Sequence, residues 1–289
     1  MEFAVLPPYR AGVAADPDWM TRFAQRVERL GFESLYLVEH VVVATDYDST
    51  YPYSSSGRMP LRSDCPIPDP LELAAFLLAR TSRLIIGTGI LVAPHHHPLI
   101  LAKRAATLDV LSQGRFRLGV GVGWMSEELE STGVDFTTRG RRLDEQLEVM
   151  TQVWADDDVS HSGEFFQFDH VCSHPKPTGG RVPIHVGGHS RAAARRAGRF
   201  GDGFHPLGID DDVLEDRLEI VREAAGGRNV ELTLGAPLQT VDPAVVAQRR
   251  AQGATRLLLS TATADLMELE DELGAAVARL GPEFAPSTI

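Results

Sequence analysis

Histidines in two segments of the chain have the chemistry to move a proton or to hold a ligand. His40 follows Glu39 at the end of an apolar run, and residues 95–97 are three histidines in a row. An imidazole at the end of a strand can act as an acid–base group near neutral pH, although a structural histidine is equally common there. Adjacent residues of an extended loop point in different directions, so we expect residues 95–97 to line a loop or pocket rather than to bind a metal ion. We expect no metal site in the chain.

Two glycine-rich segments could lie against a bound ligand. In residues 118–124, glycines alternate with other residues at the end of a predicted strand, without the spacing of a dinucleotide-binding fingerprint. Such glycines let a flat ring or a backbone approach closely, or they mark a bulge. In residues 185–190, two glycines and Ser190 precede a predicted helix. Free N–H groups at the start of a helix bind anions, so this turn predicts a phosphate site, with a capped surface helix as the alternative.

Basic residues gather after this turn in a chain that is otherwise acidic. They are Arg191, Arg195, Arg196 and Arg199 on the predicted helix, with Lys103 and Arg104 on another helix. The cluster predicts a basic rim for an anionic ligand, and solvated surface arginines are the alternative.

Residues 188–192 also resemble the nucleophile turn of a hydrolase. Only one histidine, His205, follows Ser190, and Asp202 is the only acid between them. That spacing leaves no room for the sheet elements that separate the members of such a triad, so a hydrolase is not favoured.

Short apolar runs alternate with longer helical patterns along the chain. Strands are expected at about residues 3–6, 34–38, from 84, 115–120, 183–186, 203–205, 232–238 and 256–259. Helices are expected at about residues 17–30, 70–80, 98–111, 126–132, 139–155, 190–200, 211–225, from 243, and 264–280. The alternation predicts a single α/β domain over residues 1–289, a (β/α)8 TIM barrel, with a doubly wound sheet as the alternative. Long insertions at 39–69 and 159–180 flank strand ends, where barrel active sites form, and the second is expected to be a short hairpin or an extended segment.

Composition argues against several other classes. The chain has 28 basic and 40 acidic residues and a net charge of −12, which argues against a nucleic-acid or anionic-membrane partner. Two cysteines are too few for a disulfide framework or a cysteine-rich zinc site. No apolar run approaches the roughly 18 residues of a membrane span, and the N-terminal segment lacks the pattern of a signal peptide. We therefore expect a soluble cytoplasmic protein.

Six segments together resemble the luciferase-like monooxygenase family, and within it the branch of deazaflavin-dependent oxidoreductases that use coenzyme F420. The segments are Leu37 to His40, Ile86 to Leu91, Pro98 to Leu111, Gly114 to Trp124, Val186 to Ser190 and Ala197 to Phe204. Each segment alone is weak evidence, but the combination is specific. The last third of the chain resembles the family only in its pattern of strands and helices.

The resemblance implies a (β/α)8 barrel that binds a flavin-type ring at the C-terminal ends of its strands. It implies a cis peptide bond between Gly89 and Ile90, in a bulge that supports the ring, and a coenzyme phosphate held at residues 187–190. The residues implied to bind the coenzyme are Glu39, His40, Thr88, Gly89, Ile90, Gly121, Val122, Gly123, Gly187, Gly188, His189 and Ser190.

His40 matches a catalytic histidine of related sugar-phosphate dehydrogenases, but two other positions depart from them. Glu39 replaces the usual aspartate, and Trp124 stands where those enzymes carry a catalytic glutamate. The departures argue against the sugar-phosphate reaction. They leave His40 as the predicted catalytic residue, with Glu127 or Glu128 as substitutes for the missing acid.

The resemblance thus implies an oxidoreductase that transfers a hydride between coenzyme F420 and a small organic substrate, which the loop 39–69 would cover. The basic rim favours F420, whose tail is anionic. One alternative is an FMN-dependent monooxygenase that works with a separate flavin reductase, and another is a non-catalytic flavin-binding relative. Because family members are commonly dimers, we expect a homodimer.

Overall fold

Aspartate–proline pairs decide where several helices begin. Asp16, Asp69 and Asp242 each precede a proline, and each carboxylate accepts hydrogen bonds from backbone N–H groups of the first helical turn. Proline fits this turn because its missing N–H would have no partner there. The computed structural model describes residues 1–287, and no helix in that range is long and apolar enough to cross a membrane. The helices are α1 (Pro17–Arg29), α2 (Pro70–Leu78), α3 (Pro98–Ser112), α4 (Ser126–Ser131), α5 (Arg139–Ala155), α6 (Arg191–Phe200), α7 (Asp211–Ala225), α8 (Pro243–Ala251) and α9 (Leu266–Leu280).

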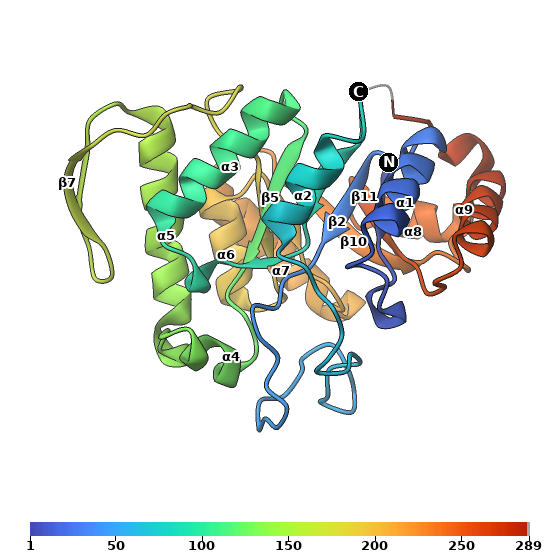
Figure 1. Ribbon diagram of the computed structural model, residues 1–289, viewed down its shortest axis with the longest axis horizontal. Helices are drawn as coiled ribbons and strands as arrows, with labels where there is room; N and C mark the ends of the chain where they lie inside the picture. Colours follow the sequence, from blue (N-terminus) through green and yellow to red (C-terminus); the bar gives the residue numbers. More distant parts are fainter. Residues whose placement is uncertain (288–289) are drawn as a thin grey trace.

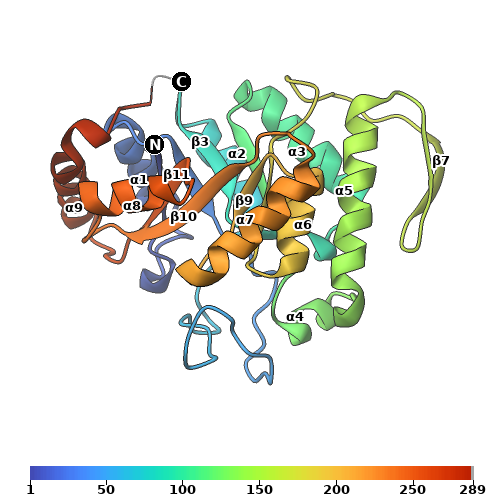
Figure 2. The same cartoon turned by 180° about the vertical axis from the view of Figure 1, so that it is seen from behind.

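Parallel strands close into a barrel inside these helices (Figure 1). The strands are β1 (Glu2–Leu6), β2 (Ser34–Leu37), β3 (Ile85–Thr88), β5 (Phe116–Gly121), β8 (Ile184–Gly187), β9 (Gly203–His205), β10 (Glu231–Pro237) and β11 (Arg256–Ser260). Their order around the barrel is β3, β2, β1, β11, β10, β9, β8 and β5, and pairing of β3 with β5 closes the ring. The predicted (β/α)8 barrel is therefore confirmed. Figure 2 shows α6 and α7 along the outside of the barrel, near β9 and β10.

The barrel interior carries paired charges at the N-terminal ends of the strands. Glu33, just before β2, accepts hydrogen bonds at 2.8 Å from Arg117 and from Arg256. Arg256 also contacts Glu231 at 2.9 Å, so two acids face two bases. Burial raises the pKa of Glu33, but Arg117 and Arg256 lower it by more, and the pKa lies well below its ordinary value. The network fills the closed end of the barrel with compensated charge.

Tyr36 fills the middle of the barrel, because the positions that face it are glycine. A Cβ at Gly87 would lie 2.7 Å from the Tyr36 ring, and a Cβ at Gly89 would lie 3.0 Å from it. His205 packs edge-on against Tyr36, with 5.8 Å between the ring centres. Burial lowers the pKa of His205 from 6.5 to about 4, so this imidazole is neutral near pH 7.

The two insertions leave the barrel in different directions. Residues 39–69 project below the barrel in Figure 1, and this fully described segment contains neither helix nor strand. The second insertion contains an antiparallel hairpin of β6 (Val159–Ser162) and β7 (Gln167–Val171), as expected from the sequence. The hairpin stands beside α5, where the carboxylate of Glu145 accepts from the backbone N–H groups of Phe165 and Phe166.

Both lysines of the chain hold the base of this hairpin. Nζ of Lys103, on α3, donates to the carbonyl oxygen of His174. Nζ of Lys176 donates to the carbonyl oxygens of Val153, at 2.9 Å, and Asp156, at 2.6 Å, near the end of α5. The segment that returns from β7 to the barrel is thereby tied to two helices.

Candidate active site

A break in the third barrel strand forms the centre of the candidate site. The peptide bond between Gly89 and Ile90 is cis, as the family resemblance implied. The chain then resumes as β4 (Leu91–Val92), which pairs with β5. The Ile90 side chain lies over two glycines, because a Cβ would be 2.3 Å from its Cδ1 at Gly121 and 2.5 Å from its Cγ2 at Gly187. Glycine at both positions is what leaves room for Ile90.

His40 follows β2, the strand that pairs with β3, and is held by Glu128 of α4. The distance from Nδ1 of His40 to Oε2 of Glu128 is 2.8 Å. A carboxylate only accepts hydrogen bonds, so Nδ1 carries the proton in this pair. Nε2, the other ring nitrogen, takes no part in this hydrogen bond. The Glu128 side chain is almost fully buried, and its Oε1 accepts from the backbone N–H of Val41 at 2.7 Å. The pair thus fixes the orientation of the His40 ring.

Two histidines of the triple run stand beside the same carboxylates. Nε2 of His96 contacts Oε1 of Glu39 at 2.9 Å, and the other Glu39 oxygen accepts from the backbone N–H of Val92 at 2.5 Å. Nε2 of His95 lies 3.8 Å from Oε1 of Glu128. Burial lowers the pKa of His95, and the nearby Glu128 opposes that shift. The run therefore lines the site, and Glu39 supports it from a buried position.

Aromatic rings form a continuous row from His40 to the turn after β8. Trp124 lies 6.2 Å from the His40 ring and 5.1 Å from Tyr51, measured between ring centres. Tyr51 lies 5.3 Å from Tyr53, which lies 5.5 Å from His189. All of these contacts are edge-to-face, an arrangement that aromatic rings prefer. The insertion 39–69 thus contributes an aromatic wall beside the barrel mouth, and burial raises the pKa of Tyr53 to about 12.

The turn after β8 leads into the N-terminus of α6. Oγ of Ser190 accepts from the backbone N–H of Ala193 at 3.1 Å, which makes Ser190 the N-cap. Gly188 has φ of +108°, a conformation that side chains disfavour. Arg217 of α7 donates from Nε to the carbonyl oxygen of His189 at 2.8 Å. This geometry has the amide donors and the partial positive charge that suit a phosphate.

Acidic side chains compensate part of the basic rim expected on α6. Arg191 pairs with Asp216. The buried Arg196 pairs with Asp144 at 2.6 Å, and Arg199 lies 4.0 Å from Glu148. The acids come from α5 and α7, which pack beside α6, and they compensate Arg191, Arg196 and Arg199, whereas Arg195 forms no ion pair among residues 1–287. Lys103 is bound to His174, as described above, and Arg104 pairs with Asp69 and Glu72 of α2.

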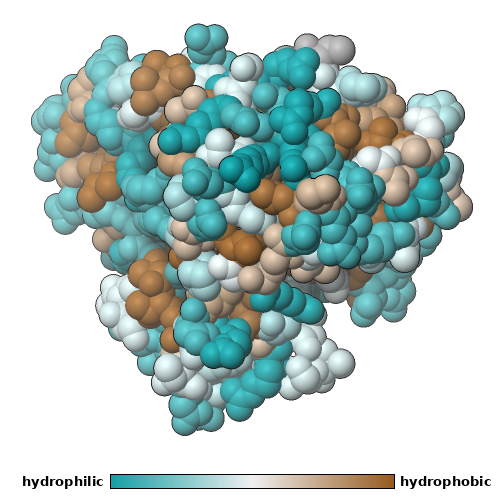
Figure 3. All heavy atoms as spheres, turned by 45° about the vertical axis from the view of Figure 1, so that its right-hand side comes forward, coloured by the Kyte–Doolittle hydropathy of each residue, from teal (hydrophilic) through white to brown (hydrophobic). Residues whose placement is uncertain are grey.

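An apolar cleft of about 290 Å³ opens on the other side of the barrel mouth. It is lined by Leu6, Pro206, Leu207, Gly208, Ile209, Leu234, Gly235, Ala236, Pro237, Leu258, Ser260 and Arg249. The only charged side chain among them, Arg249, pairs with Asp211 at 2.8 Å. Tyr53 borders the cleft, since a Cβ at Gly208 would lie 3.3 Å from its ring. Figure 3 shows a mainly hydrophilic surface that is hollowed beside the projecting loop.

Comparison with known proteins agrees with this geometry. A model of the luciferase-like monooxygenase family matches residues 1–281. The chain belongs to this family. A solved structure of an F420-dependent secondary alcohol dehydrogenase with an F420–acetone adduct has the same fold as this luciferase-like chain, with a TM-score of 0.78 and 18% identity over 97% of this chain and 99% of that chain.

Three relatives in sequence illustrate the range of the luciferase-like family. An uncharacterized protein of Mycobacterium tuberculosis is 35% identical over 206 residues, which are 70% of this chain and 71% of the relative. An F420-dependent glucose-6-phosphate dehydrogenase of Microbacterium testaceum is 30% identical over 73% of this chain and 60% of its own length. An FMNH(2)-dependent dimethylsulfone monooxygenase of Pseudomonas fluorescens is 28% identical over 75% of this chain and 56% of its own length. The chain is therefore related to enzymes with either kind of coenzyme.

The structure brings together most of the residues that the luciferase-like resemblance implied. They lie at the C-terminal ends of four strands: Glu39 and His40 after β2, Thr88 to Ile90 at β3, Gly121 to Gly123 at β5, and Gly187 to Ser190 at β8. The hydroxyl of Thr88 donates to the carbonyl oxygen of Gly119 at 2.6 Å, so its side chain faces the barrel wall and not the mouth. Val122 packs against the hydrophobic core.

Sequence reasoning missed part of the luciferase-like site. The loop 39–69 was expected only to cover the substrate, and no pattern indicated the row of contacts from its Tyr51 and Tyr53 to Trp124 and His189. Arg217 carried no signal, because it reaches the turn from a helix that begins at Asp211.

Proposed function

We propose that this luciferase-like chain is an oxidoreductase that transfers a hydride between coenzyme F420 and a small, apolar organic substrate. The observation that carries the proposal is the His40–Glu128 pair just after β2, the strand that pairs with β3 and its Gly89–Ile90 bulge. Support for F420 over other coenzymes comes from the F420-dependent relative at 30% identity. The arginines of α6 add little to this choice, because Arg191 and Arg196 are already paired with aspartates.

The residues at the barrel mouth fit such a coenzyme. Gly121 and Gly187 leave room for the Ile90 side chain, and a flat ring could lie against Ile90. The N-terminus of α6 and its cap Ser190 would hold the phosphate. The buried Nδ1 of His189 has no hydrogen-bond partner among residues 1–287, which suits a polar ligand atom at this turn. The bound coenzyme would supply hydride chemistry, which no side chain of the chain can supply.

The chain itself would position the substrate and move the proton. With Nδ1 committed to Glu128, Nε2 of His40 is the atom that would donate a proton to a substrate oxygen or remove one from it. Trp124 and Tyr51 would exclude water from that position, because the Trp124 ring stands beside the His40 ring and Tyr51, in the loop 39–69, packs against Trp124. A proton held in a dry site reacts with the substrate and not with solvent.

The apolar cleft supports an uncharged substrate of modest size, such as a ketone, an alcohol or an unsaturated carbonyl compound. Its lining offers aliphatic side chains, and the guanidinium of Arg249 is already paired. A sugar phosphate would place a dianion against this lining without a free positive charge, which is unfavourable. The apolar cleft and the presence of Trp124 in place of a catalytic glutamate both argue against a sugar-phosphate substrate.

An FMN-dependent monooxygenase is the second candidate, favoured by the relative that uses reduced FMN at 28% identity. Both coenzymes carry a tricyclic ring and a ribityl phosphate, so Ile90 and the α6 turn would accept either. A homodimer and a cytoplasmic location stay predictions.

Coenzyme titration tests the proposal directly. Purified protein is mixed with F420 or with FMN while quenching of coenzyme fluorescence is recorded, and reduced F420 is then reacted with small ketones and enals without oxygen. We expect tighter binding of F420 and substrate-dependent oxidation, which His40→Asn slows roughly 100- to 10,000-fold. Binding of neither coenzyme would refute the proposal. Tight FMN binding with substrate-dependent oxygen uptake would select the second candidate, and F420 binding without turnover would indicate a non-catalytic relative.

A further inference from the structure

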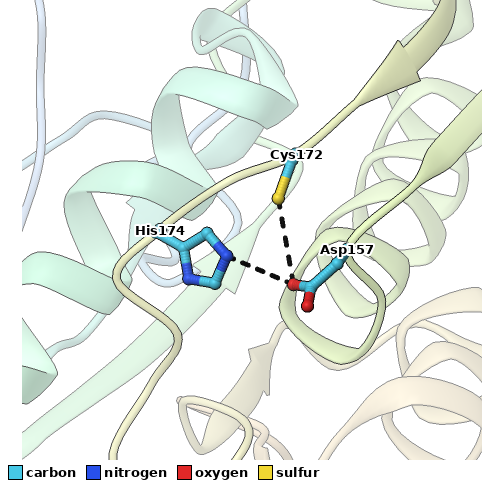
Figure 4. Close-up of side chains that lie close together, drawn as sticks. All are labelled: Asp157, Cys172 and His174. Atoms are coloured by element: carbon cyan, nitrogen blue, oxygen red, sulfur yellow. Dashed lines mark hydrogen bonds and ion pairs between the residues drawn. The ribbon is translucent and has the colours of Figure 1, made fainter.

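Three side chains that ligate metals meet at the base of the β6–β7 hairpin, away from the barrel mouth (Figure 4). Asp157 follows α5, while Cys172 and His174 lie on the segment that leaves β7. Oδ1 of Asp157 is 3.2 Å from Nε2 of His174 and 3.8 Å from Sγ of Cys172. The three ligand atoms all lie within 4.8 Å of one another, and all three residues are exposed to solvent.

Two of these separations are close to the edges of a tetrahedral metal site. Zinc binds sulfur at about 2.3 Å and nitrogen or oxygen at about 2.0–2.2 Å, which places pairs of ligand atoms roughly 3.3–3.6 Å apart. The two measured distances, 3.2 Å and 3.8 Å, fall beside that range. An ion could thus be bound after rotation of these exposed side chains, with water as the fourth ligand.

We propose that Asp157, Cys172 and His174 bind one Zn²⁺ ion per chain. A thiolate, an imidazole and a carboxylate together favour zinc over magnesium or calcium, which prefer oxygen ligands alone. The ligands come from both ends of the hairpin, because residues 157 and 172 flank β6 and β7. The ion would therefore close the hairpin at its base and stabilise it against opening. The site is independent of the redox chemistry proposed above.

Lys176 sets the strength of this site. Its Nζ lies 3.1 Å from Oδ1 of Asp157, the same oxygen that would ligate the ion. The ammonium is fixed there by the carbonyl oxygens of Val153 and Asp156. A fixed positive charge repels a bound cation, so zinc should bind more weakly than at a site without that charge. Lys176→Gln removes the charge and keeps an amide donor, and we expect it to tighten binding about tenfold.

Cobalt titration tests the site, because Co²⁺ replaces zinc and reports its ligands by absorption. Reduced, metal-free protein without a histidine tag is titrated with Co²⁺. We expect a thiolate-to-cobalt charge-transfer band in the near ultraviolet that saturates at one ion per chain and disappears when Zn²⁺ is added. The melting temperature should rise when Zn²⁺ is present.

Substitutions at exposed positions separate the site from other cysteines and histidines. Cys172→Ser should abolish the band, and Asp157→Asn and His174→Ala should each weaken cobalt binding at least about tenfold. The matched controls are Cys65→Ser, Asp158→Asn and His170→Asn, which should leave the titration unchanged. Asp158 and His170 pair with each other nearby, at 3.1 Å, without belonging to the cluster.

Two outcomes would overturn the proposal. One is wild-type protein that shows no thiolate band with excess Co²⁺. The other is a band that survives in Cys172→Ser or is lost in Cys65→Ser, since the sulfur ligand would then lie elsewhere. Circular dichroism of each variant confirms that it is folded before titration, so that a lost band reports a lost ligand.

Discussion

The imidazole of His40 donates to the carboxylate of Glu128 across 2.8 Å, between residues that are 88 positions apart in the sequence. The bond joins the loop after β2 to the short helix α4. The other oxygen of the same carboxylate accepts from the backbone of Val41 and lies 3.8 Å from His95. Glu128 therefore holds the loop and the ring together, so that the ring nitrogen opposite to it is the one available to a substrate.

Glu128→Gln tests this positioning role. The amide preserves size but lacks the charge that orients Nδ1 of His40, and a small misplacement of an acid–base group can cost about 100-fold in rate. We expect turnover to fall about 100-fold while the dissociation constant of the coenzyme changes little. The pH dependence of turnover should change in Glu128→Gln and stay as in the wild type in Glu130→Gln, an exposed neighbour on the same helix. Wild-type turnover in Glu128→Gln would contradict the role.

Gly121→Ala tests the space that Ile90 occupies. The added Cβ would lie 2.3 Å from Cδ1 of Ile90, so the side chain must move toward the coenzyme site. Overpacking of this kind costs about 1–3 kcal/mol, which predicts coenzyme binding about tenfold weaker or more. Because valine lacks that Cδ1, Ile90→Val should restore binding in the double variant.

Gly187→Ala provides the contrast within the same experiment. Its added Cβ would meet Cγ2 of Ile90 at 2.5 Å, an atom that valine keeps, so Ile90→Val should not rescue it. Gly179→Ala is the neutral control, since a Cβ there would meet nothing within 4 Å. Equal rescue of both glycine variants would show that the clash does not control binding.

The sequence was sufficient to predict the order of strands and most helix ends, because these depend on local signals. Apolar runs between helical patterns, and aspartate before proline at α1, α2 and α8, do not depend on distant residues. β4, with only two residues, had no such signal and arises because the chain pairs again with β5 after the bulge. The single-domain prediction for residues 1–289 stays a prediction.

Glu33→Gln tests the buried charge network. Removing the acid leaves Arg117 and Arg256 facing each other, and breaking a buried pair typically costs about 3–5 kcal/mol of unfolding free energy. The pKa of Glu33 is lowered in the folded protein, so its stabilisation is complete above the ordinary value of 4.5 and is lost as the pH falls below it.

Urea unfolding of wild type and Glu33→Gln at pH 7 and pH 3.5 measures this effect. The difference in unfolding free energy between the two proteins should be smaller by about 1 kcal/mol at pH 3.5 than at pH 7. Glu231→Gln changes a partly exposed carboxylate of the same network, so we expect it to lower the unfolding free energy by less than Glu33→Gln does. A gap that widens on acidification would contradict the assignment.

His205→Phe tests the neutral histidine in the barrel. The folded protein holds the pKa of His205 at about 4, against an ordinary value of 6.5. The unfolded chain therefore takes up a proton first as the pH falls through 6.5, and the wild type loses stability. Between pH 7 and pH 5 the wild type should lose about 2 kcal/mol more than His205→Phe, which keeps a ring against Tyr36. Identical losses measured by urea unfolding would contradict this.

The candidate site was less predictable than the fold, because the contacts of its side chains join residues that are far apart in the chain. The arginines of α6 were interpreted as a basic rim, yet Asp144 and Asp216 on neighbouring helices neutralise two of them. Glu128 was only a substitute acid in the sequence, and its bond to His40 depends on how the loop 39–69 folds back. The coenzyme-binding residues stay predictions until a titration tests them.

The two lysines at the base of the hairpin have a practical consequence. Apart from the amino terminus, Lys103 and Lys176 are the only primary amines of the chain, and both lie at one side of the barrel, beside α3 and α5. Amine-reactive dyes, cross-linkers and activated supports should therefore modify this edge and leave the aromatic wall untouched. A protein coupled through these amines would be immobilised in few orientations, with its barrel mouth open to solution.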